Sequence, residues 1–163
     1  GNIKWLVSGD INKEIIYDCD GRISEKGMRA ARLKIHKAGS VLIALNGQGK
    51  TRGKVAFLAV DATCNQSLVS MYPKDDNLVD AMYLYYILNN MYQEIRELTG
   101  DKDRSGLNMG IIRDIKLPLP SINVQKDIVK QIKMELEFIE PSKAIVNMFA
   151  KKMHDKIMEV WVR

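Results

Sequence analysis

The residues best suited to chemistry lie in a glycine-rich, cationic segment, Asn46 to Lys54, with the sequence NGQGKTRGK. The segment holds three glycines, two lysines and one arginine, and it contains no acid. Because glycine lacks a side chain that would keep the backbone away from a ligand, such a segment brings amide groups and cations close to phosphates. The pattern predicts a loop that contacts phosphates or nucleic acid through Gln48, Lys50, Thr51, Arg52 and Lys54.

Enzymatic alternatives fit the sequence less well. Gly49-Lys50-Thr51 looks like the end of a nucleotide-binding P-loop, but Ala44 stands where the P-loop needs its first glycine. The chain has neither the clustered acids of a nuclease nor a GxSxG nucleophile motif nor the [DNS]PP[YFW] tetrapeptide of adenine methyltransferases. The only cysteines and histidines are Cys19, Cys64, His36 and His154. They are too few and too scattered in the sequence for a zinc site or a disulfide framework. The sequence therefore predicts a non-enzymatic chain without metal or cofactor, with a small nuclease as the alternative.

Positive charge is concentrated in one part of the chain. The net charge is +5, yet the segment from Arg22 to Lys54 carries nine basic residues and one acid. Such a concentration favours a polyanionic partner, because cations that neutralise phosphates release condensed counterions. A solvated basic face without a ligand is the simpler alternative. We expect further contacts with a polyanionic partner from this segment and from a second polar loop at Thr99 to Gly110. The residues are Lys26, Arg29, Arg32, Lys102, Arg104, Ser105 and Asn108.

Asn65 and Gln66 allow two interpretations. Both side chains can bind the edge of an adenine base bidentately. More often, such a pair fixes a loop through hydrogen bonds from side chain to backbone, and we favour that structural role.

The elements that must position these residues form a mixed α/β (α+β) domain at about residues 1–120. The chain has 163 residues, of which 46% are hydrophobic and 28% charged, enough for one globular core. No apolar run approaches the length of a membrane span, and the first residues do not resemble a secretory signal, so we expect a reduced cytoplasmic protein. The expected elements are strands at 41–45, 55–60 and 63–72, a helix capped by Asn77 or Asp80 and running to Leu98, with a tyrosine-rich packing face, and a short element at 115–119.

Residues 121–163 are expected to form a helical arm with a coiled-coil seam. Apolar residues repeat every seven positions, as in a seam that packs against a partner helix, with Lys143 as the polar exception at position a. Pro141 leaves two possibilities, one kinked helix or two helices that fold back as a hairpin. The residues that we expect to mediate dimerisation are Val129, Ile132, Leu136, Ile139, Val146, Ala150, Met153, Ile157 and Val160.

Several motifs occur in the order typical of one family. They are a Trp5 to Ile11 pair spaced W-x5-I, ISEKG at Ile23 to Gly27, AGSVLIALNGQGKTRGKVAFL, TCNQSLV, YLYYIL, a glycine-containing loop before Leu107, and IKLPLPSINVQKDIVKQI. Together they resemble the target recognition domain and conserved helix of a type I restriction-modification specificity subunit. The last motif is similar to that family's IPLPPLxEQxxIV junction, although Asn123-Val124 replaces the acid that usually precedes the glutamine.

The resemblance implies a subunit that reads double-stranded DNA and catalyses nothing itself. It would direct a separate adenine methyltransferase subunit, and with it the restriction subunit, to one half of a bipartite site. Members of the family usually carry two recognition domains, so this chain resembles a fragment, or a half-subunit that forms a homodimer through its arm. A coiled-coil adaptor without DNA affinity is the second alternative.

Overall fold

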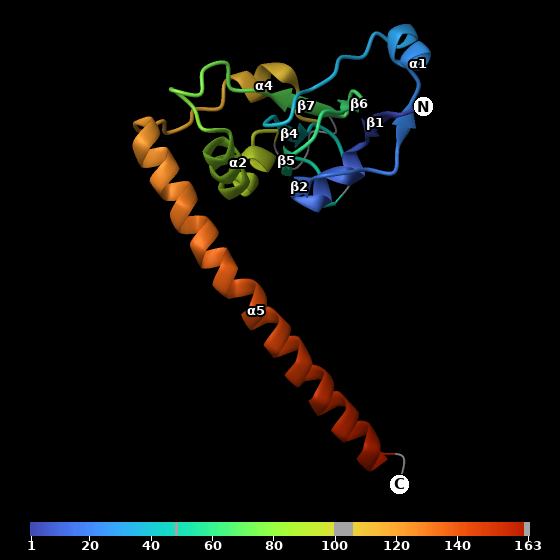
Figure 1. The fold of residues 1–163 in the computed structure, drawn as a ribbon, viewed down its shortest axis with the longest axis vertical. Coiled ribbons are helices and arrows are strands. Elements are labelled where there is room, and N and C mark those ends of the chain that lie inside the picture. Colours follow the sequence, from blue (N-terminus) through green and yellow to red (C-terminus); the bar gives the residue numbers. More distant parts are fainter. Residues whose placement is uncertain (48, 100–105, 162–163) are drawn as a thin grey trace. The chain divides into compact units, whose positions relative to one another are not determined.

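The chain divides into two units that share one long helix. The computed structural model describes residues 1–47, 49–99 and 106–161. Unit 1 comprises Gly1–Gln125, and unit 2 comprises Lys126–Arg163. Figure 1 shows the strands of unit 1 next to short helices. Helix α5 (Ile122–Trp161) begins in unit 1 and forms unit 2 from Lys126 onwards. We refer to residues 126–161 of this helix as the arm.

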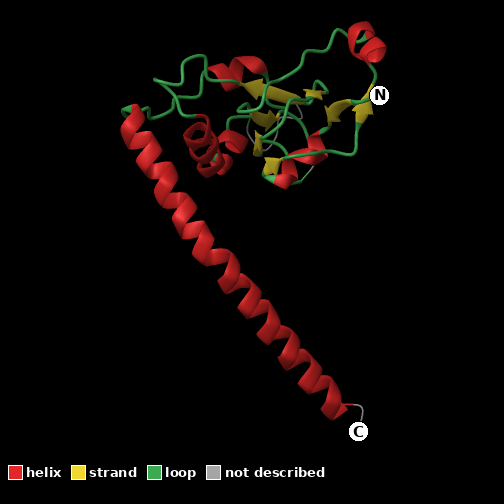
Figure 2. Cartoon of the chain, viewed as in Figure 1, coloured by secondary structure: helices red, strands yellow, loops and turns green. Residues whose placement is uncertain are grey.

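Unit 1 contains both strands and helices, which confirms the predicted α/β class (Figure 2). Its elements, in chain order, are β1 (Ile3–Leu6), the 3-10 helix η1 (Ser8–Lys13), β2 (Ile15–Ile16), β3 (Arg22–Ile23), α1 (Glu25–Ala30), β4 (Val41–Ala44), β5 (Val55–Leu58), β6 (Thr63–Cys64), β7 (Leu68–Met71), α2 (Ala81–Asn90), α3 (Tyr92–Glu97), α4 (Met109–Arg113) and the first turn of α5.

The strands form two mixed sheets. The larger sheet has the order β2-β5-β4-β7, in which β4 pairs antiparallel with both β5 and β7, and β2 pairs parallel with β5. The smaller sheet has the order β3-β1-β6. Strands β4 and β5 therefore occupy the centre of the larger sheet, and the glycine-rich segment is the loop that joins them.

Strands β4 and β5 are buried on both faces. Their side chains alternate between two apolar clusters, so that Leu42 and Ala44 belong to one cluster and Val41 and Ile43 to the other. The second cluster also contains residues of α2, α3 and α4, which cover that face of the sheet. Two-sided burial explains why β4 has an uninterrupted apolar sequence rather than an alternating one.

The predicted strands and helices of unit 1 need three corrections. The segment 63–72 is not one strand, because a turn at 65–67 sends β6 to the smaller sheet and β7 to the larger one. The predicted helix begins after the Asp80 cap, as expected, but it is interrupted at Met91 and continues as α3. The short element expected at 115–119 is absent from these described residues, and α4, which the apolar pattern did not predict, precedes it.

Helix α5 is continuous through Pro141, so the alternative of a hairpin is wrong for this chain. Proline removes one amide donor from the helix. The hydroxyl of the next residue, Ser142, donates a hydrogen bond of 2.8 Å to the carbonyl of Phe138. A helix of 40 residues retains its other backbone hydrogen bonds, and the loss of one donor does not end it.

The first turn of α5 is fixed to unit 1 by a buried amide. The Gln125 side chain is fully buried. Its oxygen accepts a hydrogen bond of 3.0 Å from the backbone amide of Asp80, at the start of α2. Its nitrogen donates to the carbonyls of Leu78 at 2.9 Å and Pro120 at 2.7 Å. Both amide protons and the amide oxygen are thus satisfied, and the polar group joins three segments of unit 1.

We predict that Gln125→Ala destabilises unit 1 by roughly 2–4 kcal/mol, because it leaves several buried backbone groups without a partner. Urea unfolding, followed by the fluorescence of Trp5 in a chain that carries Trp161→Phe, measures this loss. Gln131→Ala removes an exposed glutamine from the same helix and serves as the matched control. Equal midpoints for the two variants would show that the buried hydrogen bonds contribute nothing.

Candidate nucleic-acid interface

The β4–β5 loop is built on a hydrogen-bonded base with glycines above it. At the base, the amide of Ala44 donates to the carbonyl of Lys54, and the amide of Gly53 donates to the carbonyl of Ala44, both at 2.9 Å. Gly47, Gly49 and Gly53 have φ angles of 142°, 69° and 81°, a region that side chains other than hydrogen disfavour. The glycines that suggested a ligand-binding loop are therefore also required by its backbone path.

The end of the second predicted loop lies against the start of the first. The amide of Leu107 donates a hydrogen bond of 3.0 Å to the carbonyl of Leu45. Gly106 approaches so closely that a Cβ atom there would stand 2.0 Å from Oδ1 of Asn46. The structure thus brings together two segments that are some sixty residues apart in sequence. We call their described residues, 46, 47, 49–54 and 106–108, the loop surface.

Two neighbouring elements also hold the β4–β5 loop. The Lys54 ammonium group donates a hydrogen bond of 2.9 Å to Oδ1 of Asn12 in η1. Nδ2 of Asn12 donates a hydrogen bond to the carbonyl of Gly9, and this second bond fixes the orientation of the Asn12 amide. On the other side, the Tyr92 hydroxyl donates to the carbonyl of Lys50, and Arg96 donates to that of Gly49, both at 2.7 Å. No motif predicted a role for Asn12 or Arg96, and the tyrosine-rich face of the predicted helix indicated packing for Tyr92.

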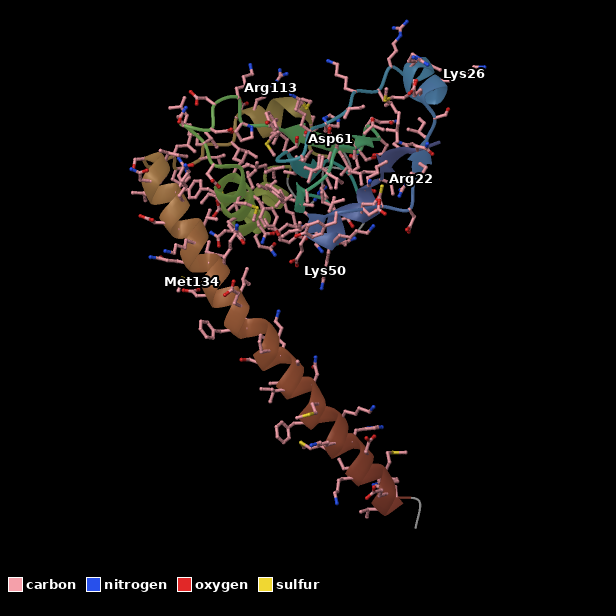
Figure 3. All side chains as sticks on the ribbon, in the orientation of Figure 1. Arg22, Lys26, Lys50, Asp61, Arg113 and Met134 are labelled. Carbon is pink, nitrogen blue, oxygen red and sulfur yellow. The ribbon has the colours of Figure 1, made fainter. Side chains whose placement is uncertain are left out.

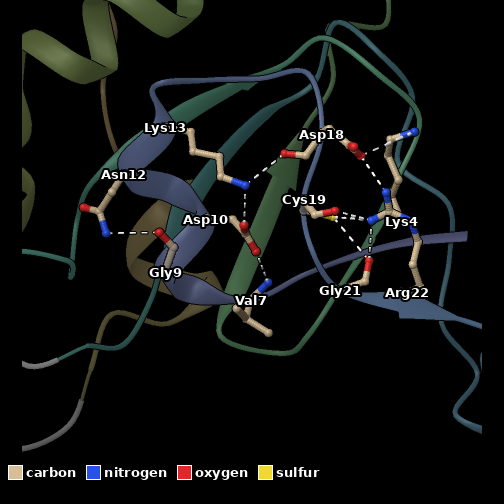
Figure 4. A network of polar contacts seen from close by, with 10 residues as sticks. All are labelled: Lys4, Val7, Gly9, Asp10, Asn12, Lys13, Asp18, Cys19, Gly21 and Arg22. Atoms are coloured by element: carbon tan, nitrogen blue, oxygen red, sulfur yellow. Dashed lines mark hydrogen bonds and ion pairs between the residues drawn. The ribbon is translucent and has the colours of Figure 1, made fainter.

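The cations of the loop differ from those of the N-terminal segment in their partners. Lys4, Lys13 and Arg22 form ion pairs with Asp10 or Asp18 (Figure 4). The hydrogen bond from Lys13 to Asp10 raises the pKa of the lysine. The pKa of Asp18 is lowered, chiefly by a hydrogen bond from the backbone at Cys19 and also by the charges of Arg22 and Lys4.

Within the described ranges, by contrast, Lys50, Arg52 and Lys54 have no acidic partner within ion-pair distance. Among the residues that the structure describes, the Lys54 side chain is hydrogen-bonded only to the neutral Asn12 amide, which does not compensate its charge. Three uncompensated cations on one short loop attract anions and repel one another. An anionic ligand such as a phosphate backbone would relieve that repulsion.

The other predicted cations lie elsewhere on unit 1. Lys26 and Arg29 belong to α1, and Arg32 follows this helix with a φ of 52°. Figure 3 shows Lys26 at the upper edge of unit 1 and Lys50 at its lower edge. Arg29 also pairs with Glu25 at 3.3 Å. The basic segment from Arg22 to Lys54 is therefore continuous in sequence but does not form one surface.

Two of the predicted polar residues have a structural role. Oδ1 of Asn65 accepts a hydrogen bond of 3.1 Å from the amide of Ser67, while Gln66 is exposed. Oδ1 of Asn108 caps α4 by accepting from the amides of Gly110 and Ile111. Thr51 is half-buried in the loop. The predicted contact residues that fall outside the described ranges are Gln48, Lys102, Arg104 and Ser105.

The described residues include no arrangement for metal binding. In these ranges, no group of three or more His, Cys, Asp or Glu side chains could hold a metal ion. Cys19 and Cys64 are buried, and burial raises the pKa of both thiols, that of Cys64 to about 11. Burial likewise lowers the pKa of His36. As for membranes, no helix among the described residues has both the length and the hydropathy of a bilayer span.

Comparison with known proteins identifies related sequences and folds. The sequence pattern of the family described as "Type I restriction modification DNA specificity domain" matches residues 1–145. The type I restriction enzyme MjaIX specificity subunit of Methanocaldococcus jannaschii is 24% identical over 149 residues, covering 88% of this chain and 33% of the relative. The EcoR124I/EcoR124II specificity subunit of Escherichia coli is 26% identical over 137 residues, covering 80% and 32%.

Solved structures show the same fold. A chain from a structure of the assembly and conformational transition of the type I R-M system has a TM-score of 0.67 at 17% identity, covering 94% of this chain and 36% of that one. The HsdS subunit from Thermoanaerobacter tengcongensis has a TM-score of 0.59 at 16% identity, covering 87% and 32%. The chain spans about a third of the length of the curated relatives that it matches.

We predict that Cys64 reacts with a disulfide reagent at pH 8 at least roughly 100-fold more slowly in the native chain than in urea, because burial keeps the thiol protonated and covered. A Cys19→Ala chain isolates the reaction of Cys64. Since the folded pKa of about 11 exceeds the unfolded value, this thiol stabilises the fold below about pH 8.5, and the contribution is lost as the pH rises towards 11. Rapid native labelling would contradict the burial and would make a nucleophilic thiol plausible.

Proposed function

Because the chain belongs to the type I restriction modification DNA specificity domain family, we propose that it binds double-stranded DNA and reads one half of a bipartite target site. Methyl transfer then takes place on a separate adenine methyltransferase subunit, with the restriction subunit as a further partner, and this chain contributes no catalytic residue or cofactor. Within the chain, residues 1–120 are the DNA-reading domain, and residues 121–163 connect it to the other subunits.

The observation that carries the DNA proposal is that the cations of the loop surface have no acidic partner among the described residues. Lys50, Arg52 and Lys54 lie on one loop whose backbone is held by neighbouring elements, so their charges stay close together without a counter-ion from the described part of the protein. Phosphate groups spaced along a duplex match such a set of cations, and their binding releases counterions. A small ligand binds in an enclosed cavity, whereas an extended polyanion can bind to a loop at the protein surface.

The side chains of the loop surface suggest a division of roles. An ammonium group acts as a point charge and suits phosphates, whereas the planar guanidinium of Arg52 can also bind guanine through two parallel hydrogen bonds. Lys50 and Lys54 therefore position the duplex, and Arg52 is the candidate for reading a base. The cations of α1 and Arg32 contribute a separate and weaker contact with the DNA backbone, since they lie apart from the loop (Figure 3).

The arm is proposed to join this chain to others through two apolar faces. Val129 is buried and Ile132 half-buried, but the later seam residues are exposed, from 41% for Leu136 to 75% for Val160. A seven-residue apolar repeat is complementary to a second copy of itself, which favours a homodimer along the seam. A second stripe, formed by Met134, Phe138, Ile145 and Met148, is also exposed and follows another side of the helix. We assign that stripe to the methyltransferase subunit.

Substitution of the loop cations tests the DNA proposal. We predict that Lys50→Ala weakens binding to every duplex and lowers the slope of log affinity against log salt by about 1, as for one lost phosphate contact. Arg52→Ala should in addition reduce discrimination at one base pair by about 1–3 kcal/mol. Titrations of the intact chain with labelled duplexes between about 50 and 200 mM salt measure both effects.

Arg29→Ala is the matched control, because it removes a cation of α1 that already has an acidic partner. We expect it to cost less affinity than Lys50→Ala. If Arg29→Ala lost more affinity while the Lys50 and Arg52 variants bound normally, the DNA interface would lie at α1 and not at the loop. If the unmodified chain had no salt-dependent affinity for any duplex, the adaptor alternative would hold instead.

The proposed seam is tested by placing a charge in it. We predict that Met153→Glu raises the dimer dissociation constant at least roughly 30-fold, which corresponds to about 2 kcal/mol of lost apolar burial. Sedimentation of the intact chain over a concentration series gives this constant. Met148→Glu makes the same chemical change outside the seam and should leave the dimer intact. Equal weakening by both variants, or a monomeric unmodified chain, would contradict dimerisation through the seam.

A further inference from the structure

Tyr92 and Arg96 lie one turn apart on α3 and both contact the backbone of the β4–β5 loop. Both are half-buried. The Tyr92 hydroxyl donates to the carbonyl of Lys50, and one guanidinium nitrogen of Arg96 donates to the carbonyl of Gly49, each at 2.7 Å. The same nitrogen lies 2.8 Å from the Tyr92 oxygen, and the guanidinium carbon lies 5.4 Å from the centre of the tyrosine ring. The two side chains thus support each other while they hold two consecutive carbonyls.

Gly53 completes the contact between the loop and α3. Its φ of 81° favours glycine, and a Cβ atom there would stand 3.1 Å from Cγ of Arg96 and 3.5 Å from Cγ2 of Ile95. The loop backbone therefore lies directly against the helix at this point. Contacts at Gly49, Lys50 and Gly53 together attach the middle and the end of the loop to one helix.

A loop rich in glycine has many conformations unless something restricts it, and a ligand that binds one of them must offset the lost entropy. The apparent dissociation constant rises in inverse proportion to the fraction of molecules in the competent conformation. Contacts that restrict the loop before the ligand arrives therefore strengthen binding without touching the ligand.

We propose that Tyr92 and Arg96 are positioning residues for DNA recognition. They hold the β4–β5 loop in the conformation that presents Lys50 and Arg52 to the duplex. This inference rests on the proposed function of the loop surface. It assigns no DNA contact to Tyr92 or Arg96 themselves.

Two variants test the inference, and each is measured in two ways on the intact chain. Tyr92→Phe removes one hydroxyl and no charge, so a loss of affinity cannot come from a lost cation at a phosphate. Arg96→Gln removes the donor to Gly49 together with a charge. We expect each to weaken binding of a labelled mixed-sequence duplex roughly 3- to 10-fold, as the competent fraction falls. Hydrogen–deuterium exchange at residues 49–53 should become faster in both.

The salt dependence of binding separates positioning from direct contact. Because the loop cations still meet the same phosphates, the slope of log affinity against log salt should stay unchanged in both variants, whereas it falls by about 1 when a phosphate contact is lost. Tyr86→Phe is the matched control, since the hydroxyl of Tyr86 makes no hydrogen bond to the described residues. It should leave both exchange and affinity as they are.

Other outcomes overturn the inference. Unchanged affinity and unchanged exchange in Tyr92→Phe would show that the loop needs no such support. A slope lowered by about 1 in Arg96→Gln, with Tyr92→Phe binding normally, would make Arg96 a phosphate contact instead. An unmodified chain that binds no duplex would contradict the proposed function, and the inference with it. If the unmodified chain binds duplex normally, a negative result with the two variants contradicts only the positioning role.

Discussion

Strands β4 and β5 are buried on both faces, and this burial determines where the loop between them can extend. Apolar side chains pointing to opposite sides fix the register of the pair, because a slip by one residue would exchange the two faces. The loop therefore begins and ends at fixed positions, at one end of the two central strands of the larger sheet. Gly106 and Leu107, from a distant part of the chain, pack against the start of the loop at Leu45 and Asn46. The loop that carries Lys50, Arg52 and Lys54 is held at its base because the residues of strands β4 and β5 are among the most buried of the molecule.

The junction with the arm uses a polar group for a similar purpose. A buried amide is costly unless every donor and acceptor is satisfied, and Gln125 meets this condition through Leu78, Asp80 and Pro120. An apolar side chain at this position would leave these backbone groups unpaired, so the sequence tolerates few alternatives. The directional hydrogen bonds also fix the start of α5 relative to α2, a restriction that non-directional apolar packing would not impose.

The sequence predicted the parts of the fold that depend on local periodicity. The apolar runs at β4 and β5, the Asp80 cap and the long C-terminal helix follow from residue spacing, and the ordered motifs identified the family. The turn at Asn65, which divides β6 from β7, depends on which sheet each strand joins, and no local pattern contains that information. The separation of the α1 cations from Lys50 is likewise a property of the three-dimensional path (Figure 3). Charge that is concentrated in the sequence indicates a class of partner but does not define a surface.

The manner in which the loop is held affects what its side chains can do. Tyr92 and Arg96 bind the carbonyls of Gly49 and Lys50, which every amino acid possesses, rather than the side chains of the loop. A substitution at Lys50 or Arg52 can therefore change the contacts offered to a ligand while the support of the backbone remains. The glycines are different, because their φ angles and the close approach of Gly53 to α3 restrict those positions. The loop thus combines positions that maintain its shape with positions whose side chains are free to determine what it binds.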